Sequence, residues 1–422
     1  MSYDFARTRA AITQGVATGL HIGAQLAVFR DGHSVLHEAT GLARPAVPEI
    51  GQSEQPMTPD TLVVWMSAGK PITAVGIAQL WEQGLLALDD PIAKHVPEFA
   101  QHGKDAITIR HALTHTAPLR LVDIRWPLES WEQGVARVCA ARPEPRFIPG
   151  RHAGYSMHAT WFMLGEIIRR LAPLMPARTA QAGGESDAAD PFDTEDVAAT
   201  TLARHYRTHL FLPAGMPDSH LALSPAQQAH YADRLAIMQV TEKHPAPPFP
   251  YGTETPNALA NPRPSGGLRG PVRELARFYE NVAASMSGLQ SAIGNGQSAI
   301  SSPHPLTSSS PHLLLPQTTE ALTARHRVHT PDKTFGAIID WGLGFILNSN
   351  TYGNPATPYQ YGPHAGPRTF GHSGNQSSVA FHDPDNRVTV ACVFNGMPGE
   401  QKHQARTRAV LDAIYEDLGL AQ

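Results

Sequence analysis

The sequence predicts an α+β fold, in which one antiparallel sheet is built from both chain ends and flanked by helices, with a helix-rich lobe in between. Two observations carry this prediction. Strand pairs are expected near each end of the 422 residues, and the middle of the chain has helical periodicity. A lone two-stranded hairpin is marginal in water, so the two pairs need each other to complete a sheet.

The first strand pair spans 24–30 and 34–40, and it is joined at Asp31-Gly32, a signal of a tight turn. The second pair spans 377–382 and 388–394, on either side of an Asp-Pro-Asp turn. These two pairs are the expected centre of the sheet.

Helices are expected next to both strand pairs. Near the N-terminus, apolar residues on one helical face are Phe5, Ile12, Val16 and Leu20. Near the C-terminus, the range 405–418 repeats apolar residues every four positions. Both segments are therefore expected to pack on the sheet as amphipathic helices.

These elements divide the chain into a sheet-containing region, 1–85 with 320–422, and a helix-rich region, 86–319. Two stretches of the second region, 176–196 and 285–312, are rich in Ala, Gly, Ser, Pro and acidic residues. Such composition buries too little apolar surface to offset the entropy of ordering. We expect both to be flexible insertions.

Composition favours a small-molecule substrate. The 33 basic and 37 acidic residues give a net charge of −4, and no basic run suits nucleic acid or an anionic membrane. No apolar run reaches the roughly 20 residues of a membrane span, and the first 19 residues lack a signal-peptide core. Cys139 and Cys392 are expected to be reduced core residues. These features predict a cytoplasmic protein; nothing in the sequence indicates its oligomeric state.

The main chemical signal is Ser67 followed by Lys70 at the start of an apolar helical run. Residues i and i+3 share one face of a helix, so the two side chains touch. A serine hydroxyl is a weak nucleophile until a neighbour takes its proton, and a desolvated lysine can help to do so. Amides at the helix N-terminus add positive potential where an oxyanion would develop. Of the six lysines, only Lys70 follows a serine at this spacing.

The range 61–84 resembles the nucleophile segment of the serine β-lactamase superfamily, which includes penicillin-binding proteins, D-alanyl peptidases, esterases and transacylases. The ranges 86–99 and 108–116 are similar to the segments that follow it in that family. The resemblance implies a β-lactamase/transpeptidase-like fold and a cofactor-free and metal-free serine hydrolase that works through an acyl-Ser67 intermediate. It further implies a small-molecule acyl donor, with water, an alcohol or an amine as acceptor.

The same resemblance assigns a catalytic base to Tyr155, 88 residues after Ser67. The ammonium of Lys70 is expected to lower the pKa of this tyrosine and so let it act as base. Where the family commonly has an asparagine two residues on, this chain has Met157. That departure favours the esterase branch over amide recognition of the penicillin type.

The third element of the resemblance is the strand segment Phe370–Asn375, in which His372 stands where lysine is commoner. It implies that the amides of Ser67 and Asn375 form an oxyanion hole, and that His372 orients the catalytic pair and binds an acceptor group. Ser373 and Gly374 complete this oxyanion and substrate-binding segment, and glycine there permits close approach of the substrate.

Other interpretations remain open. On the same fold, the chain could be a β-lactamase or D-alanyl peptidase, or a catalytically silent binding protein. The range 371–375 nearly matches the G-x-S-x-G nucleophile elbow of α/β-hydrolases, but that mechanism needs an acid and a histidine later in the chain. A metal hydrolase is suggested by the 22 histidines, although no H-E-x-x-H motif occurs.

Overall fold

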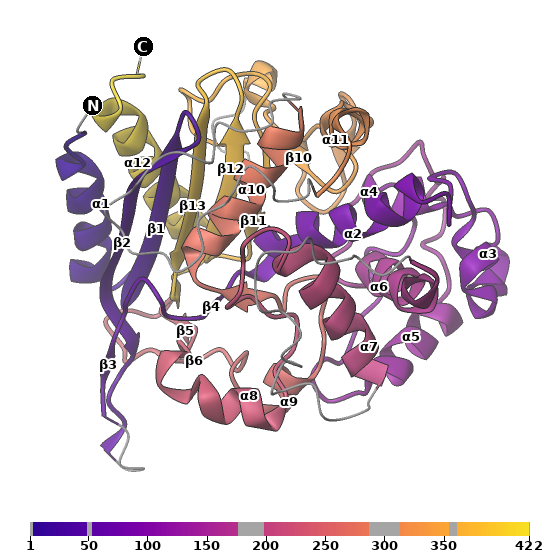
Figure 1. Ribbon diagram of the computed structural model, residues 1–422, viewed down its shortest axis with the longest axis horizontal. Coiled ribbons are helices and arrows are strands. Elements are labelled where there is room, and N and C mark those ends of the chain that lie inside the picture. The colour runs from indigo at the N-terminus through magenta and orange to yellow at the C-terminus, as the bar shows by residue number, and fades with distance from the viewer. Residues whose placement is uncertain (1–2, 49–52, 176–197, 287–312, 354–360, 422) are drawn as a thin grey trace, which may run out of the picture.

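The computed structural model describes residues 3–48, 53–175, 198–286, 313–353 and 361–421. The expected insertion 176–196 lies outside these residues, and so does 285–312 apart from Ser285 and Met286, which end a helix. Figure 1 shows a sheet with helices α1 and α12 along one face and a larger group of helices on the other side. The two chain ends lie close together beside α1 and α12.

The sheet has seven strands in the order β10-β11-β12-β13-β1-β2-β3, and every pair is antiparallel. The strands are β1 (Gly23–Arg30), β2 (His33–Arg44), β3 (Gln55–Pro56), β10 (Ile346–Leu347), β11 (Phe370–Gly374), β12 (Ser378–Asp383) and β13 (Val388–Phe394). Both chain ends build it, so the predicted fold class is confirmed.

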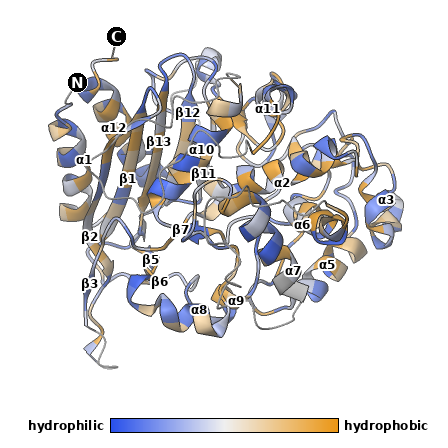
Figure 2. Ribbon diagram, in the orientation of Figure 1, coloured by the Kyte–Doolittle hydropathy of each residue, from blue (hydrophilic) through white to orange (hydrophobic). Residues whose placement is uncertain are grey.

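Side-chain alternation lets this sheet carry a core on each face. In β1, Leu26 and Val28 pack towards α12, whereas Ala27 packs towards the larger group of helices. The neighbouring strand β13 is buried at all seven positions because both faces of the sheet are covered. Apolar residues mark these central strands in Figure 2.

The α-helices are α1 (Ala6–Ala17), α2 (Lys70–Glu82), α3 (Ile92–His95), α4 (Ile109–Leu113), α5 (Trp131–Ala140), α6 (Ala159–Leu171), α7 (Ala198–His205), α8 (Pro225–His230), α9 (Pro256–Ala260), α10 (Val272–Met286), α11 (Pro316–Thr323) and α12 (Glu400–Asp417). Helices α1 and α12 pack together, and the carboxylate of Asp417 accepts from the Thr8 amide at 2.9 Å. Helix α10 comes from the range 86–319 but packs on β1, β12 and β13. The division into two regions stays a prediction.

Short strands complete the described fold. They are β4 (Val63–Val64), β5 (Gln239–Val240), β6 (Phe249–Pro250), β7 (Arg269–Gly270), β8 (Pro331–Asp332), β9 (Ala337–Ile338) and β14 (Gly396–Met397). Strand β4 leads into the turn that carries Ser67, and it pairs with β7. In the part of the chain that the structure describes, no helix is both long and apolar enough to cross a membrane. Both cysteines are free and buried, as expected, and burial raises the pKa of Cys392 to about 12.

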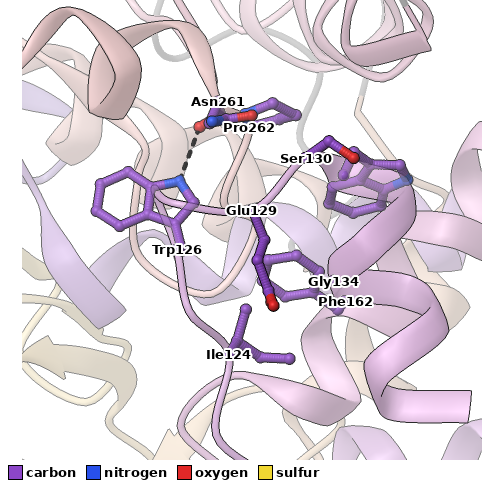
Figure 3. Close-up of a pocket in the computed structure, with 9 residues that line it drawn as sticks. Ile124, Trp126, Glu129, Ser130, Gly134, Phe162, Asn261 and Pro262 are labelled. Carbon is purple, nitrogen blue, oxygen red and sulfur yellow. Dashed lines mark hydrogen bonds between the residues drawn. The ribbon is translucent and has the colours of Figure 1, made fainter. Parts of the chain in front are cut away.

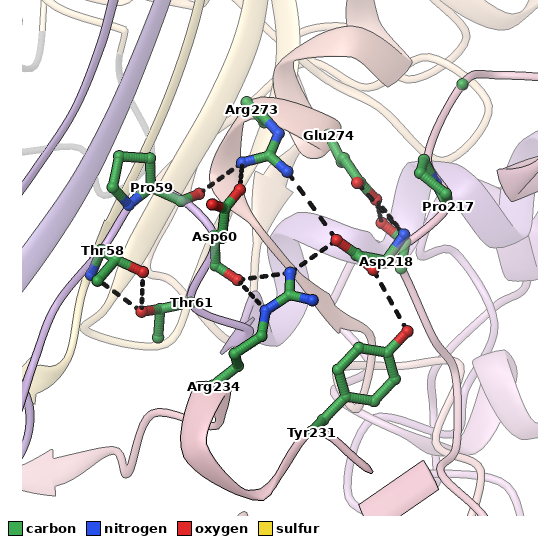
Figure 4. Close-up of polar contacts among 12 residues, drawn as sticks. Thr58, Pro59, Asp60, Thr61, Pro217, Asp218, Tyr231, Arg234, Arg273 and Glu274 are labelled. Carbon is green, nitrogen blue, oxygen red and sulfur yellow. Dashed lines mark hydrogen bonds and ion pairs between the residues drawn. The ribbon is translucent and has the colours of Figure 1, made fainter. Parts of the chain in front are cut away.

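A polar network anchors the chain just before the Ser67 turn (Figure 4). Arg273, in the first turn of α10, forms an ion pair with Asp60. Arg234 donates to the Asp60 carbonyl at 2.8 Å and pairs with the Asp218 carboxylate at 2.6 Å. The network thereby joins the nucleophile segment to α10 and to the loops around residues 218 and 234.

Candidate active site

Ser67 lies in a tight 3₁₀ turn, Met66–Gly69, that runs directly into α2. Met66 has a φ of 49°, in the left-handed region that non-glycine residues rarely adopt. Such a conformation costs on the order of 1–3 kcal/mol, and it persists only where the surroundings impose it. Here the Trp65 amide donates to the Leu268 carbonyl at 2.9 Å, and the Trp65 indole donates to the Gly270 carbonyl at 3.0 Å. The turn therefore presents a partly exposed serine from a rigid base.

The structure brings Ser67 and Lys70 together as the sequence predicts. The ammonium or amine nitrogen of Lys70 donates to Ser67 Oγ at 2.9 Å and also to the Ser265 carbonyl. Lys70 is completely buried, and its nitrogen lies 5.3 Å from the ring centre of Tyr155 and 5.5 Å from that of Trp161. This lysine is thus held against the nucleophile, away from solvent.

Tyr155 lies at the same hydroxyl, and a hydrogen bond between its side chain and Ser67 favours the phenolate. Its backbone is fixed by Asp332, whose carboxylate accepts from the Tyr155 amide at 3.1 Å, and by Thr334, whose hydroxyl donates to the Tyr155 carbonyl at 3.0 Å. Asp332 is itself buried and paired with Arg327 at 3.1 Å. Two side chains, Lys70 and Tyr155, therefore lie at the Ser67 hydroxyl.

The expected pKa of Tyr155 is wrong in direction. Burial raises the pKa of this phenol above its usual value, and this outweighs the hydrogen bond from Ser67. Burial, helped by the charge of Arg263, lowers the pKa of Lys70 well below its usual value. Lys70 thus tends to be a neutral amine, which gives Tyr155 no ammonium to stabilise its phenolate and makes Lys70 a proton acceptor.

His372 lies on β11 and is completely buried. Its Nδ1 contacts the Ser373 carbonyl at 2.7 Å; a carbonyl only accepts, so Nδ1 carries the proton and Nε2 is a lone-pair acceptor. Nε2 has no hydrogen-bond partner among the described residues. Burial lowers the pKa of His372 to about 3, so the ring is neutral. Its predicted role in substrate binding stays a prediction.

Gly374 brings β11 against the Ser67 turn. A Cβ there would lie 2.2 Å from Ser378 Oγ and 2.6 Å from the Trp65 carbonyl, so only glycine fits. Ser378 in turn donates to that carbonyl at 2.7 Å. Asn375 follows at the exposed turn, and its amide has no acceptor among the described residues. This placement suits the oxyanion role of the backbone amide, which stays a prediction.

Ser373 sits differently from its neighbours in that segment. Side chains alternate along a strand, which puts Ser373 on the face of β11 opposite His372 and Gly374. Its hydroxyl is buried, with no partner in the described part of the chain. Any contribution of Ser373 to the site would therefore come from its backbone.

Several residues that contact the catalytic side chains or their neighbours belong to no catalytic motif, and they are not predicted by the sequence analysis. Ser265 holds Lys70 through a backbone carbonyl, which every residue type has. His158 contacts Ser265 Oγ at 2.9 Å through Nδ1, and His115 accepts from the Ser156 amide at 2.9 Å. His115 lies in the range 108–116 that carries the family resemblance, so that range was the one available signal.

Metal ligation finds no support in the described ranges, where no group of three or more His, Cys, Asp or Glu side chains could hold an ion. His115 is completely buried and His158 is half-buried, and desolvation lowers the pKa of both well below the usual value. They are therefore neutral at physiological pH and add no charge to the site.

Comparison with known proteins identifies the family of the chain. The family model "Beta-lactamase" matches residues 8–181 and 194–415. Esterase EstB of Burkholderia gladioli is 36% identical over 118 residues, covering 27% of this chain and only 29% of EstB. Esterase/beta-lactamase LipL of Mycobacterium tuberculosis is 23% identical over 376 residues, covering 88% of this chain and 77% of LipL.

A solved structure extends the likeness along the whole fold. A penicillin-binding protein homologue from Caulobacter crescentus superimposes with a TM-score of 0.70 at 26% identity, covering 98% of this chain and 97% of that chain. Together with the family match, this makes the chain a member of the beta-lactamase family, with the serine-hydrolase fold of penicillin-binding-protein relatives.

Proposed function

We propose that this protein is a carboxylesterase or acyltransferase that forms an acyl-Ser67 intermediate with a small-molecule ester or amide. The observation that carries the proposal is the 2.9 Å hydrogen bond between Lys70 Nζ and Ser67 Oγ, with Tyr155 at the same hydroxyl. The esterase names of EstB and LipL support it. The presence of Ser67, Lys70 and Tyr155 together argues against a catalytically silent binding protein.

The cycle has two halves. Lys70, as a neutral amine, takes the Ser67 proton while Oγ attacks the carbonyl carbon, and the amides of Ser67 and Asn375 stabilise the oxyanion. The tetrahedral intermediate collapses, the C–O or C–N bond breaks, and the leaving group takes the proton through the Lys70–Tyr155 pair. Water or an acceptor alcohol or amine then attacks the acyl-Ser67 ester and restores the free hydroxyl.

We expect ester hydrolysis to exceed β-lactam hydrolysis. Met157, which is 55% exposed, stands where the family commonly has an asparagine that binds an amide group. A lactam amide therefore lacks the hydrogen bond that this asparagine would make, whereas an ester does not need it. The kcat/KM for p-nitrophenyl butyrate should be at least about tenfold that for nitrocefin, the size of one lost hydrogen bond.

The measurement compares both substrates on the same enzyme preparation, with Ser67→Ala as background for each. A nitrocefin kcat/KM above that for p-nitrophenyl butyrate would reject the esterase assignment in favour of a β-lactamase. Turnover of neither substrate by a folded protein that also fails to react with a fluorophosphonate would favour the silent binding protein.

A further inference from the structure

The segment 261–266 packs against the 3₁₀ turn that carries the nucleophile. A Cβ on Gly266 would lie 3.3 Å from the carbonyl carbon of Met66, so the two backbones are in close contact. The preceding residue, Ser265, is buried, and its carbonyl accepts from Lys70 Nζ. The position of this carbonyl therefore helps to set where the Lys70 amine lies relative to the nucleophile.

The Ser265 carbonyl also orients the lone pair of the Lys70 amine. A carbonyl only accepts hydrogen bonds, so one N–H of Lys70 points at it. A neutral amine has a single lone pair, and Lys70 can take the Ser67 proton only when that lone pair faces Ser67 Oγ, 2.9 Å away. A shift of the carbonyl would turn the lone pair away from the hydroxyl and slow proton transfer, although every catalytic group would still be present.

Hydrogen bonds from other elements hold the main chain just before this serine. The Trp126 indole donates to the Asn261 carbonyl at 3.1 Å (Figure 3). On α2, the Thr73 hydroxyl donates to the Pro264 carbonyl at 3.1 Å and accepts from the Tyr206 hydroxyl at 2.7 Å. These contacts fix the segment as far as the peptide group that precedes the serine.

The peptide group that follows the serine belongs to a tight turn. The Gly266 amide donates to the Arg263 carbonyl at 3.0 Å, which closes the turn locally. A turn closed in this way can shift as one unit, and the Ser265 carbonyl would shift with it. A contact on the Ser265 side chain is therefore well placed to set where that carbonyl lies.

His158 makes such a contact and joins the turn to the start of α6. Its Nδ1 lies 2.9 Å from Ser265 Oγ, and its carbonyl accepts from the Phe162 amide of α6 at 3.0 Å. The histidine is half-buried, and desolvation lowers its pKa well below the usual value, so the ring is neutral and acts through its hydrogen bond. The hydroxyl that meets this ring and the carbonyl that meets Lys70 belong to the same residue.

We propose that His158 is a positioning residue: through the hydroxyl of Ser265 it holds the carbonyl that orients the Lys70 amine. In this role it contacts neither the substrate nor the reacting atoms, and it takes part in no covalent step. The inference rests on the proposed acyl-Ser67 chemistry and adds to it a residue that sets the rate of acylation. Loss of either side chain, His158 or Ser265, should slow acylation and leave substrate affinity almost unchanged.

The test measures pre-steady-state release of p-nitrophenol from p-nitrophenyl butyrate, which gives the acylation rate constant and the substrate dissociation constant. Ser265→Ala removes the hydroxyl but keeps the carbonyl, and His158→Leu removes the ring nitrogen. Each should lower the rate constant by roughly 5- to 50-fold, as expected for a lost hydrogen bond in a buried network, with the dissociation constant within about threefold of wild type. The double variant should be at most about twofold slower than the slower single variant, because the two residues are coupled.

His158→Asn is the conservative variant that should rescue the rate. An asparagine side chain places its amide where Nδ1 of the ring lies, and that amide can donate or accept. Its acylation rate constant should stay within about threefold of wild type. The amide of His158→Gln reaches the position of Nε2 instead, so this variant should be as slow as His158→Leu. If His158→Leu does not fold, the asparagine and glutamine variants carry the same comparison.

His382→Leu is the matched control, because His382 makes the same kind of contact elsewhere: its Nδ1 lies 2.7 Å from Thr389 Oγ1. His382 is four residues along β12 from Ser378, which bonds to the Trp65 carbonyl, and this separation is about 13 Å. The control should lower the melting temperature while leaving the acylation rate constant within about twofold of wild type.

Four outcomes would overturn the proposal. They are acylation at the wild-type rate in Ser265→Ala, rate losses that multiply in the double variant, a His158→Asn variant as slow as His158→Leu, or a weakened substrate affinity in His158→Leu, which would place the histidine in substrate binding. Failure of the acyl-Ser67 chemistry is distinguishable from all of these. In that case the wild-type enzyme itself would show no burst of p-nitrophenol and no label on Ser67.

Discussion

Replacing Ser67 with alanine is expected to abolish turnover of p-nitrophenyl butyrate, with kcat falling by a factor on the order of 10⁴ or more. The change removes the attacking oxygen, while Lys70 keeps its hydrogen bond to the Ser265 carbonyl. The melting temperature should therefore change little. Steady-state kinetics and thermal unfolding monitored by circular dichroism measure the two effects.

The same kinetic experiment includes Lys70→Ala and the double variant Ser67→Ala/Lys70→Ala. Because Ser67 and Lys70 act as one unit, each single variant should lose about as much rate as the double variant. Ser224→Ala is the control for replacing a serine: Ser224 caps α8 by accepting from the Gln227 amide at 3.3 Å, so its loss should cost about 1 kcal/mol of stability and no activity. If folded Ser67→Ala kept most of the esterase activity, Ser67 would not be the nucleophile.

The second large effect concerns Tyr155 and the pH profile. Tyr155→Phe removes the hydroxyl near Ser67 but keeps the ring that packs 4.9 Å from Phe335. The rate should fall by a factor on the order of 10²–10⁴ with little loss of stability. Measured kcat/KM against pH, together with thermal unfolding, tests this.

The sign of the pH dependence follows from Lys70. Its amine must be free to take the proton, so activity should fall as the pH drops and Lys70 becomes protonated. Burial and Arg263 lower the Lys70 pKa, so this acid limb lies below the usual lysine value of about 10.4. The limb belongs to the coupled Lys70–Tyr155 pair rather than to one group.

His372→Asn is the discriminating variant for that profile. The pKa of His372 is about 3, so its removal should weaken binding or turnover without moving the limb. Should Tyr155→Phe keep nearly full rate while His372→Asn erases the limb, the base would be His372. The site would then work as a Ser–His pair.

The central strands could be predicted because their signals are local. Alternating and apolar runs bounded by turn residues locate β1 and β12 to within one residue at each end, and β13 at the same residues, 388–394. Strands β3 and β10 have only two residues each, too few to show a period. Helix α12 begins at Glu400, five residues before the predicted start, after Gly399 with a φ of 92° and no capping side chain.

Within the site, the serine–lysine contact could be predicted because helical spacing alone brings i and i+3 together. The contacts of the Ser265 carbonyl and the Asp332 carboxylate could not be predicted. Ser265 lies 195 residues after Lys70, and Asp332 lies 177 residues after Tyr155. The predicted direction of the Tyr155 pKa shift is wrong for a related reason. The sequence indicates which charge is nearby, but only the fold shows that both groups are buried and that burial outweighs the charge.

The central claim is that Ser67 becomes acylated, and intact-protein mass spectrometry after rapid mixing with p-nitrophenyl butyrate tests it most directly. The wild-type protein should gain the mass of one butyryl group, and peptide mapping should place that mass on Ser67. Ser67→Ala should show no added mass under the same conditions. A butyryl adduct on any other residue, or an equal adduct in Ser67→Ala, would contradict the account.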